Sequence, residues 1–179
     1  MEKSIPPILL QVEKDSRIRL LDAALELLGG SGAASLTLRA VEDAAGLPHG
    51  SVRHHFGDRS GLVAALFDRL AERDARQADA DVTAALEYWL GPGRTLTLAR
   101  YELFLMAARD SSLRPPLVRA RDRFVALAAE QVGATAASTV VAALDGVLLD
   151  ALVRGRTGPD DLRRAVARII GAATEPRLR

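Results

Sequence analysis

Three histidines and two arginines in one short polar stretch are the residues of this sequence best suited to contacting another molecule. His49, His54 and His55 stand close together, with Arg53 among them and Arg59 just after. Imidazole and guanidinium groups donate hydrogen bonds to phosphate oxygens and to base edges, so the stretch favours nucleic acid as a partner. Clustered histidines can also hold a metal ion, but the chain has no cysteine and no group of carboxylates beside them. We therefore expect no metal ion and no cofactor.

The histidines fall in the second of two short helices that the sequence predicts around a tight turn. Thr37 is a suitable N-cap for a helix over 38–45. Gly46 can adopt the left-handed conformation that a tight turn requires, and Pro48 suits the first turn of a helix that reaches His55. Two short helices joined in this way are typical of a helix-turn-helix, whose second helix enters the major groove of DNA. The alternative is a helical hairpin with a purely structural role.

The helical period divides this second helix into an inner and an outer face. Val52 and Phe56 are expected to face inward, and a step of about 100° per residue then turns Gly50, Ser51 and His54 outward. Small polar and weakly cationic side chains on that face suit base edges and phosphates. The residues that we expect to contact double-stranded DNA are Thr37, Arg39, His49, Gly50, Ser51, Arg53, His54, His55 and Arg59.

The order and spacing of these elements resemble the DNA-binding domain of TetR-family transcriptional regulators. The matching stretches are RIRLLDAALELL (17–28) and TLRAVEDAAGLPHGSVRHHFGDRSGL (37–62). The resemblance implies a repressor that binds a near-palindromic operator and is released by a small molecule in a helical C-terminal domain. Arg53 stands where the family usually has a Tyr that contacts phosphate, and Pro48 stands where it usually has a Ser cap. Glu42 replaces a small residue, and we expect its carboxylate to point outward or to pair with a basic group.

The rest of the chain is also predicted to be helical. Aromatic residues make up only 4% of the sequence, apolar residues recur mostly at spacings of three and four, and no alternating strand pattern is found. We expect an all-α protein of about nine helices. Its predicted parts are a flexible arm (1–16), a three-helix helix-turn-helix domain (17–61) and a helical effector-binding and dimerisation domain (62–179). The glycines that begin at Gly29 are expected to end the first helix.

A predicted helix over 95–109 points to a site for a small apolar or amphipathic effector. It is apolar on two sides but carries Arg100 and Glu102 in its middle, where a charge needs a partner or an opening. These charges are candidates to orient a ligand, and nearby aromatic side chains are candidates to enclose it. The alternative is that the aromatic residues only fill the core. The candidate effector-binding residues are Trp89, Arg100, Tyr101, Glu102 and Phe104.

The last two predicted helices, 136–153 and 159–173, each carry a long apolar stripe. One molecule is not expected to cover both stripes, so we expect a homodimer that pairs through these helices. The residues of the stripes are Val140, Val141, Leu144, Leu148 and Leu152, followed by Leu162, Val166, Ile169 and Ile170.

The composition excludes several other functions. Lys+Arg 24 against Asp+Glu 23 gives a net charge of +1, which disfavours an architectural protein that coats DNA through many phosphate contacts. No nucleophile and base fall on one predicted face, so we expect no enzyme, although a helical enzyme or ligand carrier is the alternative. The apolar run over 5–10 is too short for a membrane span and lacks the form of a secretion signal. We expect a cytoplasmic protein without membrane contact.

Overall fold

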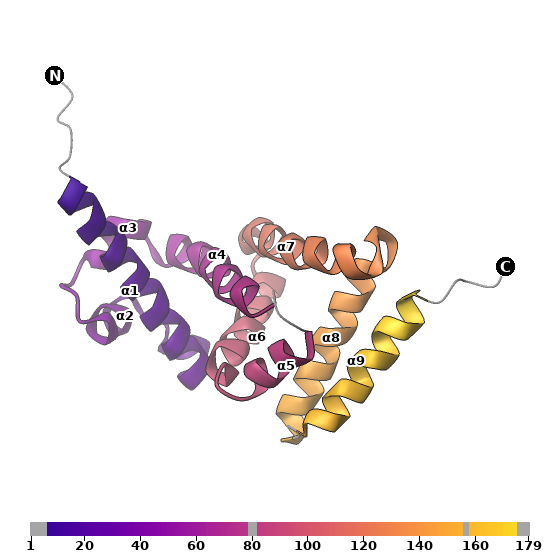
Figure 1. The fold of residues 1–179 in the computed structure, drawn as a ribbon. Coiled ribbons are helices and arrows are strands. Elements are labelled where there is room, and N and C mark those ends of the chain that lie inside the picture. Colours follow the sequence, from indigo (N-terminus) through magenta and orange to yellow (C-terminus); the bar gives the residue numbers. More distant parts are fainter. Residues whose placement is uncertain (1–6, 79–81, 156–157, 175–179) are drawn as a thin grey trace.

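The chain is built from helices throughout the computed structural model, which describes residues 7–78, 82–155 and 158–174. Within these ranges there are nine α-helices, two short 3₁₀ helices and no strand. The predicted all-α fold is therefore confirmed. Figure 1 shows α1, α2 and α3 at one end of the molecule and α8 and α9 at the other, with α4 to α7 between them.

The helices follow one another with short connections, and most begin and end close to their predicted positions. Asp58 caps α4 at its N-terminus, because its Oδ1 accepts a hydrogen bond from the Gly61 N–H at 2.8 Å. The helices are α1 (Pro7–Ser31), η1 (Ala33–Ser35), α2 (Leu38–Ala45), α3 (Ser51–Phe56), α4 (Arg59–Ala78), α5 (Val82–Leu90), α6 (Arg94–Arg109), η2 (Ser111–Leu113), α7 (Arg114–Val132), α8 (Ala134–Arg154) and α9 (Pro159–Thr174).

The expectation of a flexible arm over 1–16 is wrong for its second half. Helix α1 begins at Pro7, and residues 1–6 lie outside the described part of the chain. A proline suits the first turn of a helix because its missing N–H would have no intrahelical acceptor there. The Leu, Gln, Glu and Lys residues that follow also favour helix, so the charged composition of this segment misled the prediction.

Helix α1 continues past Gly29 and Gly30, the first two of the three glycines that were expected to end it, and ends before the third, Gly32. The φ of Gly32 is 75°, which is left-handed. Gly29 serves a different purpose, because α6 crosses α1 at this point. A Cβ on Gly29 would lie 1.9 Å from the carbonyl oxygen of Thr95. The glycine therefore allows two helix backbones to touch.

One hydrophobic core joins the N-terminal helices to the middle of the molecule. Leu25 of α1, Val41 of α2, Val52 of α3 and Leu66 of α4 are fully buried or nearly so, and Leu103 of α6 belongs to the same cluster. Because α6 packs along α1 in this core, a displacement of α6 would be transmitted directly to the N-terminal helices.

A second core forms where α5, α8 and α9 meet. Leu148 of α8 packs with Leu162 and Val166 of α9, and all three are buried within the one chain. The expectation that one molecule cannot cover both apolar stripes is therefore wrong. The stripes face each other and α5, since consecutive antiparallel helices bury their apolar sides against one another.

The outward face of α8 is apolar as well. Leu149 and Val153 are among the exposed large apolar side chains. Of the helices described, α8 alone is long and apolar enough to cross a membrane by length and composition, although most of its apolar stretch is not buried in this structure. One such helix is weak evidence for a membrane span, because helices that pair between protein subunits share this composition.

Candidate nucleic-acid interface and ligand cavity

The turn between α2 and α3 is built largely as the sequence predicts. Thr37 Oγ1 accepts a hydrogen bond from the Ala40 N–H at 3.2 Å, and Gly46 has the expected left-handed conformation with φ 61°. The start of the second helix differs: α3 begins at Ser51 rather than at Pro48. Gly50, with φ 95°, directs the chain into α3, and Ser51 Oγ donates to the Pro48 carbonyl at 2.6 Å. Pro48 therefore belongs to the turn.

Glu42 holds the start of α3 from inside the motif. Its side chain is buried, and Oε1 accepts hydrogen bonds from the backbone N–H groups of Gly50 and Val52, both at 3.0 Å. The expectation that this carboxylate points outward or pairs with a basic group is wrong. The first N–H groups of α3 have no intrahelical acceptor, and the positive end of a helix dipole favours a negative charge.

Two arginines also hold the motif together through backbone carbonyls. Arg19 of α1 donates to the Ala45 carbonyl at 2.6 Å and to the Gly46 carbonyl at 3.3 Å, at the C-terminal end of α2. Arg59 donates through Nε to the Leu36 carbonyl at 3.0 Å. The role of Arg19 was not predicted from the sequence, and Arg59 was predicted only to contact DNA. That contact stays a prediction.

Several of the predicted DNA-contacting side chains are exposed beside one another. Asp43 of α2 lies 3.0 Å from His49 and 3.9 Å from Arg39, and so brings these two residues together. His54 of α3 lies 3.8 Å from Glu13 of α1. Arg53 is exposed, and no hydrogen bond or ion pair of its side chain is seen within the described ranges. It is the cation of α3 most available to a phosphate.

His55 differs from its neighbours because it is partly buried. Burial lowers the pKa of His55, and the adjacent His54, whose ring centroid lies 4.9 Å away, acts in the same direction. Glu13 raises this pKa and Arg17 lowers it, both more weakly. The neutral form of His55 is therefore favoured, so it is suited to exchange neutral hydrogen bonds rather than to attract phosphate by charge.

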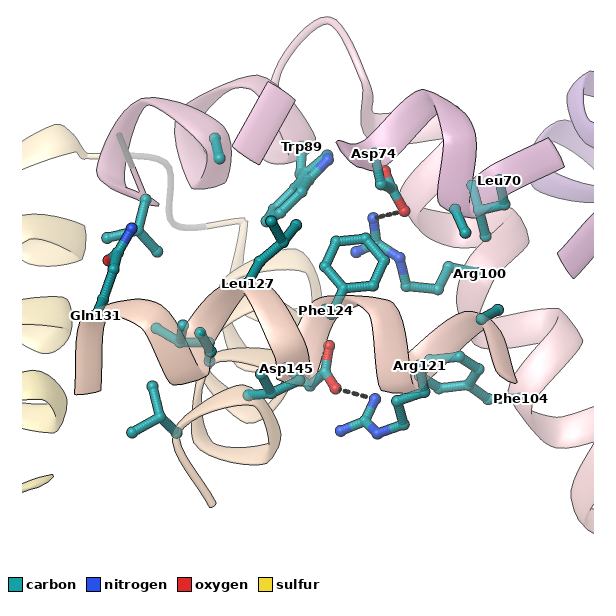
Figure 2. Close-up of a pocket in the computed structure, with 18 of the residues that line it drawn as sticks. Leu70, Asp74, Trp89, Arg100, Phe104, Arg121, Phe124, Leu127, Gln131 and Asp145 are labelled. Carbon is teal, nitrogen blue, oxygen red and sulfur yellow. Dashed lines mark hydrogen bonds and ion pairs between the residues drawn. The ribbon is translucent and has the colours of Figure 1, made fainter. Parts of the chain in front are cut away.

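A cavity of about 140 Å³ opens between the helices of the C-terminal half. Figure 2 shows how aromatic and aliphatic side chains surround it, with a few charged groups among them. Mostly apolar walls with a few polar groups are typical of small-molecule sites. The lining residues are Leu70, Ala71, Asp74, Val82, Ala85, Trp89, Arg100, Phe104, Leu117, Ala120, Arg121, Phe124, Leu127, Ala128, Gln131, Val132, Val140, Val141, Leu144, Asp145 and Ile170.

Two ion pairs stand in the wall of this cavity. Arg100 of α6 donates to Asp74 of α4 at 2.6 Å, and both side chains are buried. The Arg100 guanidinium also lies 4.8 Å from the centroid of the Trp89 ring. Arg121 of α7 donates to Asp145 of α8 at 2.5 Å, but this second pair is only partly buried. Burial raises the pKa of Asp74, while Arg100 acts to lower it.

Three of the five predicted effector-binding residues line the cavity. Trp89, Arg100 and Phe104 do so, whereas Tyr101 and Glu102 do not. The Tyr101 hydroxyl donates to the Asp145 backbone carbonyl at 2.9 Å, and both Tyr101 and Glu102 border a separate, shallow groove between α1, α6 and α8. Successive residues of a helix point about 100° apart, so 100, 101 and 102 cannot all face one cavity.

The cavity residues that were not predicted from the sequence come mainly from α7, and the others belong to α4, α5, α8 and α9. Phe124, Arg121 and Asp145 gave no distinct signal, because they are single members of ordinary amphipathic patterns. Asp74 did have one: it continues the buried stripe that includes Phe67 and Leu70, and an acid at a core position requires a partner. Within the described ranges, no three His, Asp or Glu side chains are placed to hold a metal ion.

Family models match most of the sequence. The model for bacterial regulatory proteins of the tetR family matches residues 20–66, and the model for a tetracyclin repressor-like C-terminal domain matches residues 73–172. Together they cover the motif and the cavity. No curated protein matches the sequence.

Solved structures with the same fold include two proteins of similar length. One is a TetR-family member from Streptomyces coelicolor, 31% identical, with 87% of this chain and 98% of that chain covered and a TM-score of 0.74. The other is the multidrug binding protein EbrR in complex with ethidium, 31% identical, with 86% and 98% covered and a TM-score of 0.72.

Proposed function

The chain belongs to the TetR family of bacterial transcriptional regulators, and we propose that it is a repressor released from a near-palindromic operator by a small molecule. The observation that carries this proposal is the exposed polar face of α3, whose start Glu42 holds in a fixed position relative to α2. A side chain that reads a base edge must be held rigidly, because a hydrogen bond tolerates little displacement. We place the protein in the cytoplasm with its DNA, and we assign it no catalytic activity.

The experiment that tests DNA recognition is the selection of bound sequences from a random DNA pool, followed by a shift assay. Enrichment of an inverted repeat is expected, since a two-fold dimer presents two α3 helices about one helical turn of DNA apart or a multiple of that distance. His49, Ser51 and His54 are proposed to contact bases, each contributing about 1–3 kcal/mol of discrimination. Replacing all three should change the selected sequence. An unchanged sequence would exclude α3 as the recognition helix, and a pool without enrichment would favour the ligand carrier.

The proposed dimer forms through α8 and α9, with the outward face of α8 at its centre. An exposed stripe of small and apolar residues follows this face at spacings of three and four, which suits close helix pairing. We expect Leu149→Arg to yield monomers that do not bind operator, as measured by sedimentation and shift assay. Val118→Arg, on the exposed surface of α7, is the matched control and should remain dimeric. The stripe is formed by Ser138, Ala142, Gly146, Leu149 and Val153.

The proposed effector site is the cavity lined by α4, α5, α6, α7 and α8, with one residue of α9. The similar protein EbrR is described as a multidrug binding protein and was solved with ethidium, which supports a small-molecule role for the corresponding domain here. Trp89 is the only tryptophan of the chain and lines the cavity, so its fluorescence reports on binding. Compounds that alter its emission should also reduce operator binding. If compounds that occupy the cavity never change operator binding, the cavity has no regulatory role.

A further inference from the structure

The Asp74–Arg100 ion pair differs from an ordinary structural pair because one side of it faces the cavity. The two side chains are 3% and 8% exposed, and both belong to the cavity wall. Figure 2 shows the pair beside Phe124 and Trp89, at the edge of the empty space. A ligand in the cavity therefore lies within reach of the buried Arg100 guanidinium. Asp74, the partner of this guanidinium, is a side chain that a ligand can displace.

We propose that the cavity binds an amphipathic organic anion, a carboxylate on a small hydrophobic body, which takes the place of Asp74 on the Arg100 guanidinium. This inference rests on the effector role proposed above and specifies its chemistry. The two partners of the pair are not equivalent, because a carboxyl group can bind a proton and become neutral, whereas a guanidinium stays charged. A cationic ligand on Asp74 would leave Arg100 buried without a counter-ion, which is strongly unfavourable.

Unused hydrogen-bond donors beside the pair suit a carboxylate. Within the described residues the Arg100 guanidinium makes a single hydrogen bond, to Asp74, out of the five that it can donate. The Trp89 Nε1–H is buried and makes no hydrogen bond of normal geometry in the same part of the chain, although it is near enough to Asp74 to help lower the pKa of that carboxyl group. Figure 2 shows this N–H on the side of the ring that faces Asp74. The oxygens of a ligand carboxylate can therefore accept from Arg100 and from Trp89 together.

The volume of the cavity limits the hydrophobic body of the ligand. An engineered apolar cavity of about 150 Å³ binds benzene, and the present cavity of about 140 Å³ is of similar size. One aromatic ring or a short acyl chain therefore fits. Phe124, whose ring centroid lies 6.4 Å from that of Trp89, offers an aromatic edge or face beside it.

The exchange couples ligand binding to proton uptake. Burial raises the pKa of Asp74, and Arg100, Trp89 and Arg73 act to lower it. The other charged groups in the cavity wall, Arg121 and Asp145, already neutralise each other. When a ligand occupies Arg100, the strongest lowering influence is lost, and Asp74 binds a proton from solvent. The affinity for the anion should therefore increase as the pH falls, until the ligand itself is protonated.

The same exchange provides a route to the DNA-binding helices. Asp74 belongs to α4, which packs directly on α3 through its first turns, and Arg100 belongs to α6, which touches α1 at Gly29. The ion pair is thus a buried link between the two helices that reach the N-terminal domain. A ligand that occupies Arg100 removes this link and allows α4 to move relative to α6.

The test compares three molecules that share one body and differ in charge: 3-phenylpropanoate, 3-phenylpropanol and 3-phenylpropylammonium. Binding to the full-length protein is measured by Trp89 fluorescence and by calorimetry between pH 6 and pH 8. We expect the propanoate to bind at least about tenfold more tightly than the other two. Its affinity should rise about tenfold for each unit of pH lost, which is the linkage for one proton. Calorimetry in two buffers of different ionisation enthalpy measures that proton directly.

Three variants distinguish the replacement of Asp74 by a ligand carboxylate from a general attraction of anions to positive charge. Arg100→Gln should abolish the preference for the propanoate, while Arg123→Gln, in an exposed ion pair with Asp68 outside the cavity wall, should retain it. Asp74→Asn should bind the propanoate with an affinity that no longer depends on pH. If Asp74→Asn does not fold, the pH dependence of the unmodified protein still decides the question.

The outcomes distinguish this inference from the proposed function. Equal or tighter binding of the alcohol or the ammonium compound, binding of none of the three, or propanoate binding without proton uptake would overturn the anion site. The regulatory proposal would still stand if another cavity ligand reduced operator binding. Conversely, propanoate binding with proton uptake but unchanged operator affinity would support the anion site and contradict effector release.

Discussion

Two buried carboxylates show how differently the two halves of this molecule use charge. Glu42, in the N-terminal motif, accepts hydrogen bonds from two backbone N–H groups that belong to the start of α3. Asp74, in the C-terminal half, accepts from the side chain of Arg100, next to a cavity. Both are almost fully buried. The difference lies in their partners and in the space around them.

A backbone partner fixes a structure, whereas a side-chain partner beside a cavity can be replaced. No ligand can substitute for Glu42 without unfolding the turn, because the N–H groups that it satisfies face the interior of the motif. Arg100 can rotate or accept another anion, because open space adjoins it. The motif is thus built to keep one geometry, and the cavity region is built to change.

The largest effect is expected from Asp74→Ala. Removal of the carboxylate leaves the Arg100 charge buried without a partner, which should lower the free energy of unfolding by about 3–5 kcal/mol. Urea denaturation measures the loss. The control is the double variant Asp74→Leu with Arg100→Met, which removes both charges and should be about as stable as the original protein. A single variant no less stable than the double would show that Arg100 is solvated through the cavity.

Glu42→Ala should produce the next largest effect. It leaves the N–H groups of Gly50 and Val52 without an acceptor, and each such group costs about 1–3 kcal/mol when buried. The Gly50 N–H is only partly buried and should cost about 1 kcal/mol, so we expect a total loss of about 2–4 kcal/mol in the free energy of unfolding. Operator binding should be lost at a lower urea concentration than the C-terminal structure. Glu42→Gln keeps an acceptor oxygen, so it should lower the free energy of unfolding by less. Equal losses in the two variants would mean that the charge, and not the hydrogen bonds, holds α3.

Substitution by alanine should have opposite effects on protein stability at two adjacent glycines. Gly29→Ala places a Cβ against the Thr95 carbonyl and should destabilise the protein by about 1–3 kcal/mol through overpacking. Gly30→Ala meets nothing within 4 Å and should stabilise α1 by about 0.5–1 kcal/mol, since alanine favours helix. Thermal unfolding measures both. A Gly29→Ala protein as stable as the original would show that the contact between α1 and α6 is loose.

Substitutions of Arg53 and Arg59 should distinguish an arginine that only contacts DNA from one that also stabilises the fold. If each contacts one phosphate, either change to Ala should reduce the slope of log affinity against log salt by about one. Only Arg59→Ala should also lower stability, by about 1 kcal/mol, because Arg59 donates to the Leu36 carbonyl. Shift assays over a salt series and urea denaturation measure the two quantities. An unchanged salt slope in a variant would remove that arginine from the interface.

The smallest effect is expected for the pH dependence of stability that arises from His55. The pKa of His55 is lowered in the folded protein, so the unfolded chain binds a proton more readily. Stability should therefore decrease as the pH falls below about 6.5, the ordinary value for histidine. His55→Gln should weaken this dependence, whereas His49→Gln serves as the exposed control. An identical pH profile for His55→Gln and the original protein would contradict this assignment.

The sequence by itself determined the features that depend on neighbours along the chain. The Thr37 cap and the left-handed Gly46 each require only residues within a few positions, and both are found. Helical periodicity likewise identified the helices and the all-α fold, because the spacing of apolar residues encodes the face that must be buried. The order of short elements identified the family.

Only the tertiary structure decided which distant residues meet. Glu42 was expected to point outward or to pair with a basic group. Nothing in the sequence of its own helix indicates that the first N–H groups of α3 lie within hydrogen-bond distance of its carboxylate. Gly29 resembles a helix terminator until α6 is placed across it, and Arg100 and Glu102 look equivalent until one is directed at Asp74. The stripes of α8 and α9 were likewise assigned to a partner before they were found to cover each other. Periodicity identifies which face is buried, but the burying partner depends on three-dimensional packing that is not encoded locally.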